Sequence, residues 1–135
     1  MKIIAEHRDD NPYRKALATG LVSYNDKNAP LEHWQYVGFY ALDDNGQLVG
    51  GVQGNFEWDW LHISHLWVRD SGKGLGRQLM AHAETYAKDK GKIGILLDTF
   101  AFQAKPFYEK IGFAVMGTIE NAAGSSARYF MTKRI

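Results

Sequence analysis

The stretch LWVRDSGKGLGR, residues 66–77, lies between a strand-like segment and a segment with helical spacing. Three glycines alternate with other residues at this junction. A glycine-rich turn that opens a helix presents unpaired backbone N–H groups, and the helix dipole favours anions there. Lys73 and Arg77 add positive charge. We predict a cradle for a phosphate or pyrophosphate, and a glycine-rich turn with no ligand is the alternative.

Two common phosphate motifs do not fit this stretch. The P-loop requires Ser or Thr after its lysine, and here Gly74 follows Lys73. The dinucleotide fingerprint requires G-x-G-x-x-G, and Arg77 stands where its last glycine belongs. The nearest candidate for its ribose-binding acid is Asp98, which does not lie at the required distance. ATP or NAD is therefore not the first prediction.

The segment before the turn predicts a strand over Leu61–Arg69 whose apolar phase slips. Leu61 and Ile63 are in one phase, whereas Leu66 and Val68 are in the other. A β-bulge shifts the phase of a strand by one residue in this way. A strand buried on both faces is the competing explanation.

The rest of the chain predicts alternating strands and helices. Asp43 to Gly46 forms a hairpin turn, because Asn-Gly readily supplies the positive φ angles of tight turns. Asn11 is the expected N-cap of the first helix, with Pro12 at its first position. The expected strands are Lys2–Glu6, Gln35–Leu42, Leu48–Phe56, Leu61–Arg69, Ile93–Thr99, Phe113–Ile119 and Ala127–Lys133. Further helices are expected over Gly74–Lys90 and Ala104–Ile111, and a loop over Asn25–Leu31. The fold class is α+β, with a mixed, mostly antiparallel sheet, a bulged central strand and helices on both faces.

Length and composition are those of one globular domain, residues 1–135. Hydrophobic residues make up 45% and charged residues 23% of the chain. Cysteine is absent, which excludes disulfides, thiolate metal sites and cysteine catalysis. The apolar runs are too short to span a bilayer, and the first ten residues lack the apolar stretch of a signal peptide, so we expect a cytoplasmic protein without membrane partners.

Charge is distributed unevenly along the chain. Residues 1–68 hold 5 Lys and Arg against 9 Asp and Glu, a net of −4, whereas residues 69–135 hold 11 against 6, a net of +5. A basic half can meet an anionic partner. The charges are scattered without runs, so no nucleic-acid partner is expected.

Two motifs give the chain a resemblance to a known family. Leu66-Trp67-Val68, then Gly74-Leu75-Gly76 and Leu79, follow the acetyl-CoA-binding motif of the GNAT superfamily of N-acetyltransferases. That motif is a strand reading L-x-V, a turn, and [QR]-x-x-G-x-[GA]-x-x-L at a helix start. Residues 104–113, AKPFYEKIGF, match the later pattern A-x-x-[LF]-Y-x-x-x-G-F. The element order also matches, and the chain looks like a small stand-alone bacterial GNAT protein.

The resemblance implies direct transfer of an acetyl group from acetyl-CoA to an amine in a ternary complex, without a metal. It carries the role of proton donor to the leaving thiolate onto Tyr108. A bulged strand around Leu66–Val68 would supply an N–H donor to the oxyanion. The acceptor is a small-molecule or peptide amine of unknown identity. A homodimer is the commonest oligomer, but the sequence does not select one. The implied cofactor-binding residues are Leu66, Trp67, Val68, Ser71, Gly72, Lys73, Gly74, Leu75, Gly76, Arg77 and Phe107.

The base that deprotonates the amine is not identified by the sequence. The candidates are Glu57, Asp59, His62, His65 and Asp98. In a regular strand the two histidines would point to opposite faces, because they are three residues apart, and could not bind a metal together. A metal site of the two first acids with one histidine is a weaker hypothesis.

Two alternatives to an enzyme stay open. A catalytically silent acyl-CoA-binding or regulatory module would share the fold and the glycine turn, but Tyr108 and the Gly74/Gly76 pair favour the enzyme. A purely structural interaction domain leaves the glycine turn and the basic second half unexplained.

Overall fold

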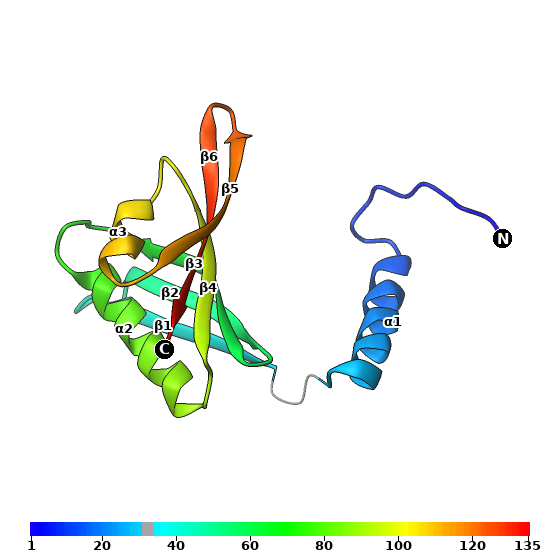
Figure 1. Ribbon diagram of the computed structural model, residues 1–135, viewed down its shortest axis with the longest axis horizontal. Coiled ribbons are helices and arrows are strands. Elements are labelled where there is room, and N and C mark those ends of the chain that lie inside the picture. The colour runs from blue at the N-terminus through cyan, green and yellow to red at the C-terminus, as the bar shows by residue number, and fades with distance from the viewer. Residues whose placement is uncertain (31–33) are drawn as a thin grey trace. The chain divides into compact units, whose positions relative to one another are not determined.

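The chain forms two compact units, residues 1–32 and 33–135. The computed structural model describes residues 1–30 and 34–135 (Figure 1). None of the helices that it describes in these ranges is long and apolar enough to cross a membrane.

The first unit contains helix α1, Tyr13–Asn28. Asn11 is confirmed as its cap, because its Oδ1 accepts hydrogen bonds from the backbone N–H groups of Tyr13 at 3.0 Å and Arg14 at 3.2 Å. The loop expected from Asn25 is wrong in its start, since α1 continues to Asn28, and its last residue, 31, lies outside the described residues.

The strand expected over Lys2–Glu6 is also wrong, because these residues form no strand. A short apolar segment becomes a strand only when a partner strand satisfies its backbone groups, and the first unit contains no other strand among its described residues. Helix α1 has no buried residue, and Leu17 and Leu21 on its apolar face are 78% and 60% exposed.

The second unit is a six-stranded sheet with strand order β1-β2-β3-β4-β6-β5. Among the described strands only β3 and β4 pair in parallel, so the α+β class with a mixed, mostly antiparallel sheet is confirmed. The strands are β1 Gln35–Leu42, β2 Leu48–Glu57, β3 Trp60–Val68, β4 Gly94–Phe100, β5 Ala114–Ala123 and β6 Ser126–Arg134. Helices α2, Leu75–Asp89, and α3, Lys105–Lys110, follow β3 and β4 respectively.

The turn between β1 and β2 has the predicted chemistry. Gly46 has a φ of +75°, the left-handed conformation that glycine adopts easily. The Asp43 carboxylate accepts hydrogen bonds from the backbone N–H groups of Asn45 at 2.9 Å and Gln47 at 3.0 Å. The turn therefore fixes the register of the hairpin.

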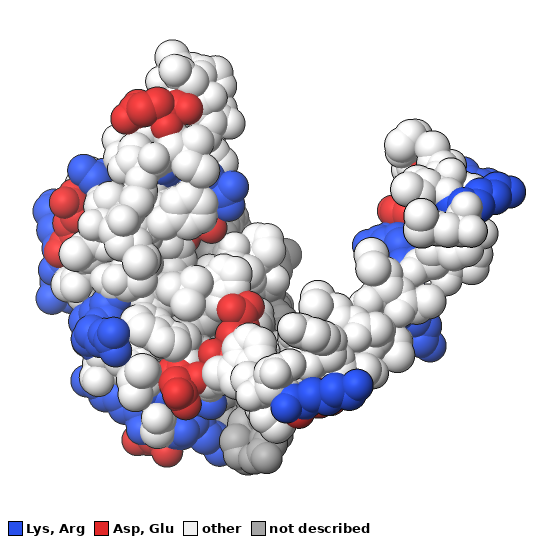
Figure 2. Space-filling model, turned by 45° about the vertical axis from the view of Figure 1, so that its right-hand side comes forward, with Lys and Arg blue, Asp and Glu red and all other residues white. Residues whose placement is uncertain are grey.

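One core cluster joins the helices to the sheet. Leu79, Met80, Ala83 and Ala87 of α2 and Tyr108 of α3 are buried in it. The strands contribute fully buried residues, which are Val52, Phe56, Leu61, Ile95 and Met131. The face shown in Figure 2 carries basic side chains interspersed with acidic ones.

The predicted bulge is present in β3. Gln53 of β2 pairs with His65, and the next residue of β2, Gly54, pairs with Ile63, so Ser64 is the extra residue. Gln53 and Asn55 lie two residues apart in β2, so their side chains and those of the residues that pair with them share one face of the sheet. His62 and His65 therefore lie on the same face, and the prediction of opposite faces is wrong because it assumed a regular strand. A strand buried on both faces is excluded as well, since His65 and Trp67 are exposed.

Gly54 makes the bulge sterically possible, because a Cβ there would lie 1.9 Å from the backbone oxygen of His62. We expect Gly54→Ala to lower the free energy of unfolding by about 3 kcal/mol or more, since the backbone at His62 must move to make room for the added Cβ. Gly117→Ala is the matched control in another strand, because a Cβ there meets nothing within 4 Å, and we expect a change within about 0.5 kcal/mol. Urea unfolding of both variants measures the difference, and equal stabilities would contradict this account.

Candidate functional site

The site forms where two neighbouring strands separate. Strands β3 and β4 pair at three positions only, from Trp60 with Gly94 to His62 with Leu96. Strand β3 continues to Val68 without a β4 partner among the described residues, while β4 stays paired with β6 as far as Phe100. The backbone groups of β3 that face this opening are therefore available to a ligand.

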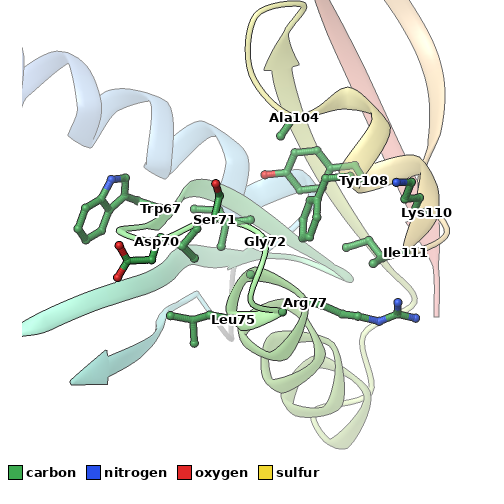
Figure 3. Close-up of a pocket in the computed structure, with 15 residues that line it drawn as sticks. Trp67, Asp70, Ser71, Gly72, Leu75, Arg77, Ala104, Tyr108, Lys110 and Ile111 are labelled. Atoms are coloured by element: carbon green, nitrogen blue, oxygen red, sulfur yellow. The ribbon is translucent and has the colours of Figure 1, made fainter. Parts of the chain in front are cut away.

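A cavity of about 450 Å³ lies between the end of β3, the start of α2 and helix α3 (Figure 3). Ten of the eleven residues predicted to bind the cofactor line it, and the eleventh, Lys73, does not. Its lining residues are Leu66, Trp67, Val68, Asp70, Ser71, Gly72, Gly74, Leu75, Gly76, Arg77, Ala104, Phe107, Tyr108, Lys110 and Ile111.

The glycine turn opens the N-terminus of α2 toward this cavity. Gly72 and Gly74 have φ angles of +82° and +79°, so the turn requires glycine at these positions. A Cβ on Gly76 would lie 3.4 Å from the ring of Phe107. The first N–H groups of a helix have no partner within it, and together they form an anion site.

Charged side chains surround this anion site. Arg77 of α2 and Lys110 of α3 both line the cavity (Figure 3). Asp70 also lines it, and its carboxylate accepts a hydrogen bond of 3.1 Å from Arg69. The cavity thus combines two cations with a helix N-terminus, an arrangement that suits an anionic ligand.

A second cavity, of about 550 Å³, occupies the opening between β3 and β4. It shares Leu66, Trp67, Val68, Ala104 and Tyr108 with the first. The two cavities therefore meet at Tyr108. The remaining lining residues are Ile63, Ser64, His65, Leu97, Asp98, Thr99 and Gln103.

Tyr108 is packed among aromatic side chains where the two cavities meet. The residue is 7% exposed, and its ring makes edge contacts with Phe107 and Phe113, with ring centroids 5.1 Å and 5.7 Å away. Figure 3 shows the ring reaching out from α3 toward the side where Ser71 and Trp67 lie. Burial, together with the negative charge of Asp98, raises the pKa of Tyr108 to about 12. The hydroxyl therefore carries its proton at neutral pH.

The loop before α3 is fixed by hydrogen bonds that the side chains of buried Thr99 and of Gln103 accept. The backbone N–H of Ala104 donates to Thr99 Oγ1 at 3.2 Å, and the N–H of Phe100 donates to Gln103 Oε1 at 2.8 Å. These bonds set where α3 begins, and hence where Tyr108 lies.

Asp98 is anchored from the neighbouring strand. Arg128 Nε donates to Asp98 Oδ2 at 2.7 Å, and the Arg128 guanidinium lies over the ring of Phe130, 5.0 Å from its centroid. The carboxylate raises the pKa of Arg128 in return. Asp98 thus brings a negative charge to the second cavity, with its cation held on β6.

The other candidate bases differ in whether they line the second cavity. His65 lines the second cavity. His62 lies apart from it, with its Nδ1 3.2 Å from the Glu57 carboxylate. These residues and Asp59 form no cluster suited to a metal ion within residues 1–30 and 34–135.

Several lining residues were not predicted from the sequence, among them Asp70, Ala104, Lys110 and Ile111 in the first cavity and Gln103 in the second. Lys110 follows Tyr108 by two residues in the matched motif. Its basic side chain next to a predicted anion site is the one signal that could have identified it.

Comparisons with known proteins agree with this geometry. A sequence model of the acetyltransferase (GNAT) family matches residues 3–113. Blasticidin-S acetyltransferase from Streptomyces morookaense is 35% identical over 99 residues, which are 71% of this chain and 73% of that protein.

Two solved structures share the fold. One is an acetyltransferase from Bacillus cereus ATCC 14579, with 32% identity, a TM-score of 0.89, and coverage of 99% of this chain and 98% of that chain. The other is an acetyltransferase from Bacillus anthracis str. Ames in complex with acetyl coenzyme A, with 24% identity, a TM-score of 0.65, and coverage of 74% and 62% respectively. The family match covers both the glycine turn and Tyr108, so the chain belongs to the GNAT family and is an acetyltransferase.

Proposed function

We propose that the protein transfers the acetyl group of acetyl-CoA directly to the amine of a small molecule in a ternary complex. The observation that supports this most strongly is the meeting of two cavities at Tyr108, one with an anion site and the other with titratable side chains. A solved structure of similar fold contains acetyl coenzyme A. No covalent intermediate is needed, because both reactants can reach the same point.

In this proposal acetyl-CoA extends from the first cavity into the second, where it meets the acceptor. The pyrophosphate of acetyl-CoA binds the N–H groups at the start of α2, near Arg77 and Lys110. The pantetheine arm enters the opening between β3 and β4, where unpaired backbone groups of β3 can bind it and the thioester oxygen. The bulge lies at Ser64 rather than around Leu66–Val68, so the separation of the strands supplies these groups.

The acceptor occupies the second cavity. A relative named blasticidin-S acetyltransferase favours a small-molecule amine over a peptide, and Asp98 would attract the ammonium form. The homodimer and the cytoplasmic location stay predictions.

Tyr108 stabilises the departing thiolate. A thiol has a pKa of about 8.5 and Tyr108 one of about 12, so complete proton transfer would cost about 5 kcal/mol. The phenol therefore acts as a hydrogen-bond donor to the thiolate, and solvent supplies the final proton. This differs from full proton donation, which a phenol with an ordinary pKa would allow more easily.

The function is tested by measuring CoA release from acetyl-CoA with a panel of amines that includes blasticidin S. We expect release that depends on the amine and yields the acetylated product by mass spectrometry. Binding of acetyl-CoA without release for any amine would instead support the silent acyl-CoA-binding module.

The anion site is tested at Gly76, because its φ angle is not positive and a substitution there does not add the backbone strain of a left-handed residue. We expect Gly76→Asp to weaken CoA binding at least about 10-fold relative to Gly76→Asn, because only the carboxylate repels the pyrophosphate. The two side chains have the same size and meet Phe107 equally, so each controls for the other. Titration calorimetry gives the affinities, and equal values would place the pyrophosphate elsewhere.

The role of the Tyr108 hydroxyl is tested by Tyr108→Phe. We expect turnover of the accepted amine to fall by about 10²-fold with CoA affinity retained, because one hydrogen-bond donor to developing charge is lost. At about pH 10 the wild type and the variant should have the same phenolate absorbance, since a Tyr108 with a pKa of about 12 is not ionised there. Unchanged turnover where chemistry limits the rate would remove Tyr108 from the mechanism.

A further inference from the structure

His65 is held by a hydrogen-bonded chain across the sheet face. Its Nδ1 lies 3.2 Å from Gln53 Nε2 and 3.1 Å from Ser64 Oγ. Gln53 Oε1 in turn accepts hydrogen bonds from the hydroxyls of Tyr36 at 2.7 Å and Tyr40 at 3.2 Å. The chain therefore runs from β1 through β2 to the bulge of β3.

The glycines of this face leave room for the chain. A Cβ on Gly38 would lie 2.7 Å from the Tyr40 hydroxyl, and a Cβ on Gly51 would lie 2.9 Å from the ring of the same tyrosine. Tyr40 can therefore lie flat over the strands and reach Gln53. The bulge at Ser64 turns His65 onto this face, opposite Gln53.

The partners of Nδ1 determine which nitrogen is free. The hydroxyl proton of Ser64 is donated to the backbone carbonyl of Gln53 at 3.2 Å, so Ser64 Oγ can only accept from Nδ1–H. In the structure the Gln53 amide faces the tyrosines with Oε1 and His65 with Nε2. An Nδ1–H on His65 requires the opposite orientation of this amide, which a turn of 180° about its last bond gives: the oxygen then accepts from Nδ1–H and the NH₂ group donates to both tyrosine oxygens. Nε2 makes no hydrogen bond to the part of the chain that the structure describes.

This arrangement allows proton uptake without rearrangement. With Nδ1–H donating to Ser64 and Gln53, neutral His65 carries its lone pair on Nε2. Protonation of Nε2 leaves the bonds of Nδ1–H unchanged. A base that is held in this way keeps one tautomer and one ring orientation through the reaction.

The titratable groups that face His65 come from several elements. Tyr36 and Tyr40 of β1 are neutral donors or acceptors, and the hydrogen bond between them, 2.9 Å long, raises the pKa of Tyr36. Asp98 of β4 and Tyr108 of α3 line the same cavity as His65. His62 and Glu57 pair with each other further along the face.

We propose that His65 is the catalytic base, which takes a proton from the acceptor ammonium onto Nε2, and that Ser64, Gln53, Tyr36 and Tyr40 position it. The nitrogen lone pair freed by this proton transfer forms the bond to the acetyl carbon, the carbonyl electron pair moves onto the oxygen, and the nitrogen then releases its second proton to water. The bond between that carbon and the CoA sulfur then breaks, and the electron pair leaves on the thiolate beside Tyr108. Asp98, across the cavity, stabilises the ammonium before transfer and the imidazolium after it. This inference rests on the proposed acetyl transfer.

The test compares His65→Gln with His62→Gln, a histidine variant on the same strand and the same face but outside the cavity. We expect His65→Gln to lower kcat/KM for the amine by about 10²-fold at about pH 7, and His62→Gln to change it less than about twofold. The loss in His65→Gln should shrink at least about tenfold by about pH 9.5, because more of an alkyl amine with a pKa of about 10.4 is then neutral in solution.

Tyr36→Phe tests the positioning chain. It should lower kcat/KM less than His65→Gln does and leave KM for acetyl-CoA unchanged, because Gln53 loses one of its two hydroxyl partners. An unchanged kcat/KM would remove Tyr36 from the chain.

Failure of this inference differs from failure of the proposed function. An active wild type whose His65→Gln variant keeps its kcat/KM, or loses it equally at every pH, would overturn the assignment of the base and leave acetyl transfer intact. A wild type that releases no CoA with any amine would overturn the proposed function itself. CoA affinity by calorimetry should be the same in wild type and His65→Gln, and its loss would show that the variant damages the first cavity instead.

Discussion

The separation of β3 from β4 after three paired positions is the constraint on which the site depends. A parallel strand that continued its pairing would fill this opening with backbone hydrogen bonds and leave no room for a ligand. The bulge at Ser64 bends β3, while pairing with β6 keeps β4 in place through Phe100. The extra residue of β3 therefore lies just past its last pair with β4, at the start of the opening, where the backbone groups of β3 have no β4 partner among the described residues.

The charges at the two ends of the opening are opposite. Arg77, Lys110 and the N-terminus of α2 surround the first cavity, whereas Asp98 brings a carboxylate to the second. The proposed acetyl transfer would draw an anionic cofactor and a cationic amine to different ends, with their reactive groups meeting at Tyr108. The phenol there is kept neutral by burial and by Asp98, so the carboxylate that is proposed to attract an amine also keeps the hydroxyl a donor.

The local features of the chain could be predicted from the sequence because their causes are local. The Asn-Gly turn, the Asn11 cap and the phase slip of β3 each arise from residues within one segment. The phase slip indicated the bulge, but its consequence for His62 and His65 depends on the register with β2, which the sequence did not provide. The strand at Lys2–Glu6 failed for a related reason, since a strand needs a partner.

The contents of the site could be predicted only in part. Ten of the eleven residues predicted to bind the cofactor lie in one continuous stretch, residues 66–77, and a motif identifies them together. The pairing of Asp98 with Arg128 and the chain from Tyr36 to His65 join segments about 30 residues apart and come together only in the folded sheet. Lys110 reaches the cavity because α3 is positioned by Thr99, which is a tertiary effect as well.

The most direct test of this account is a crystal structure of the protein with bound CoA. The account predicts the pyrophosphate at the glycine turn, the pantetheine arm between β3 and β4, and the thiol within about 4 Å of the Tyr108 hydroxyl, in hydrogen-bond range for sulfur. A CoA molecule whose thiol lies away from Tyr108, or whose pantetheine arm does not enter the opening, would contradict it.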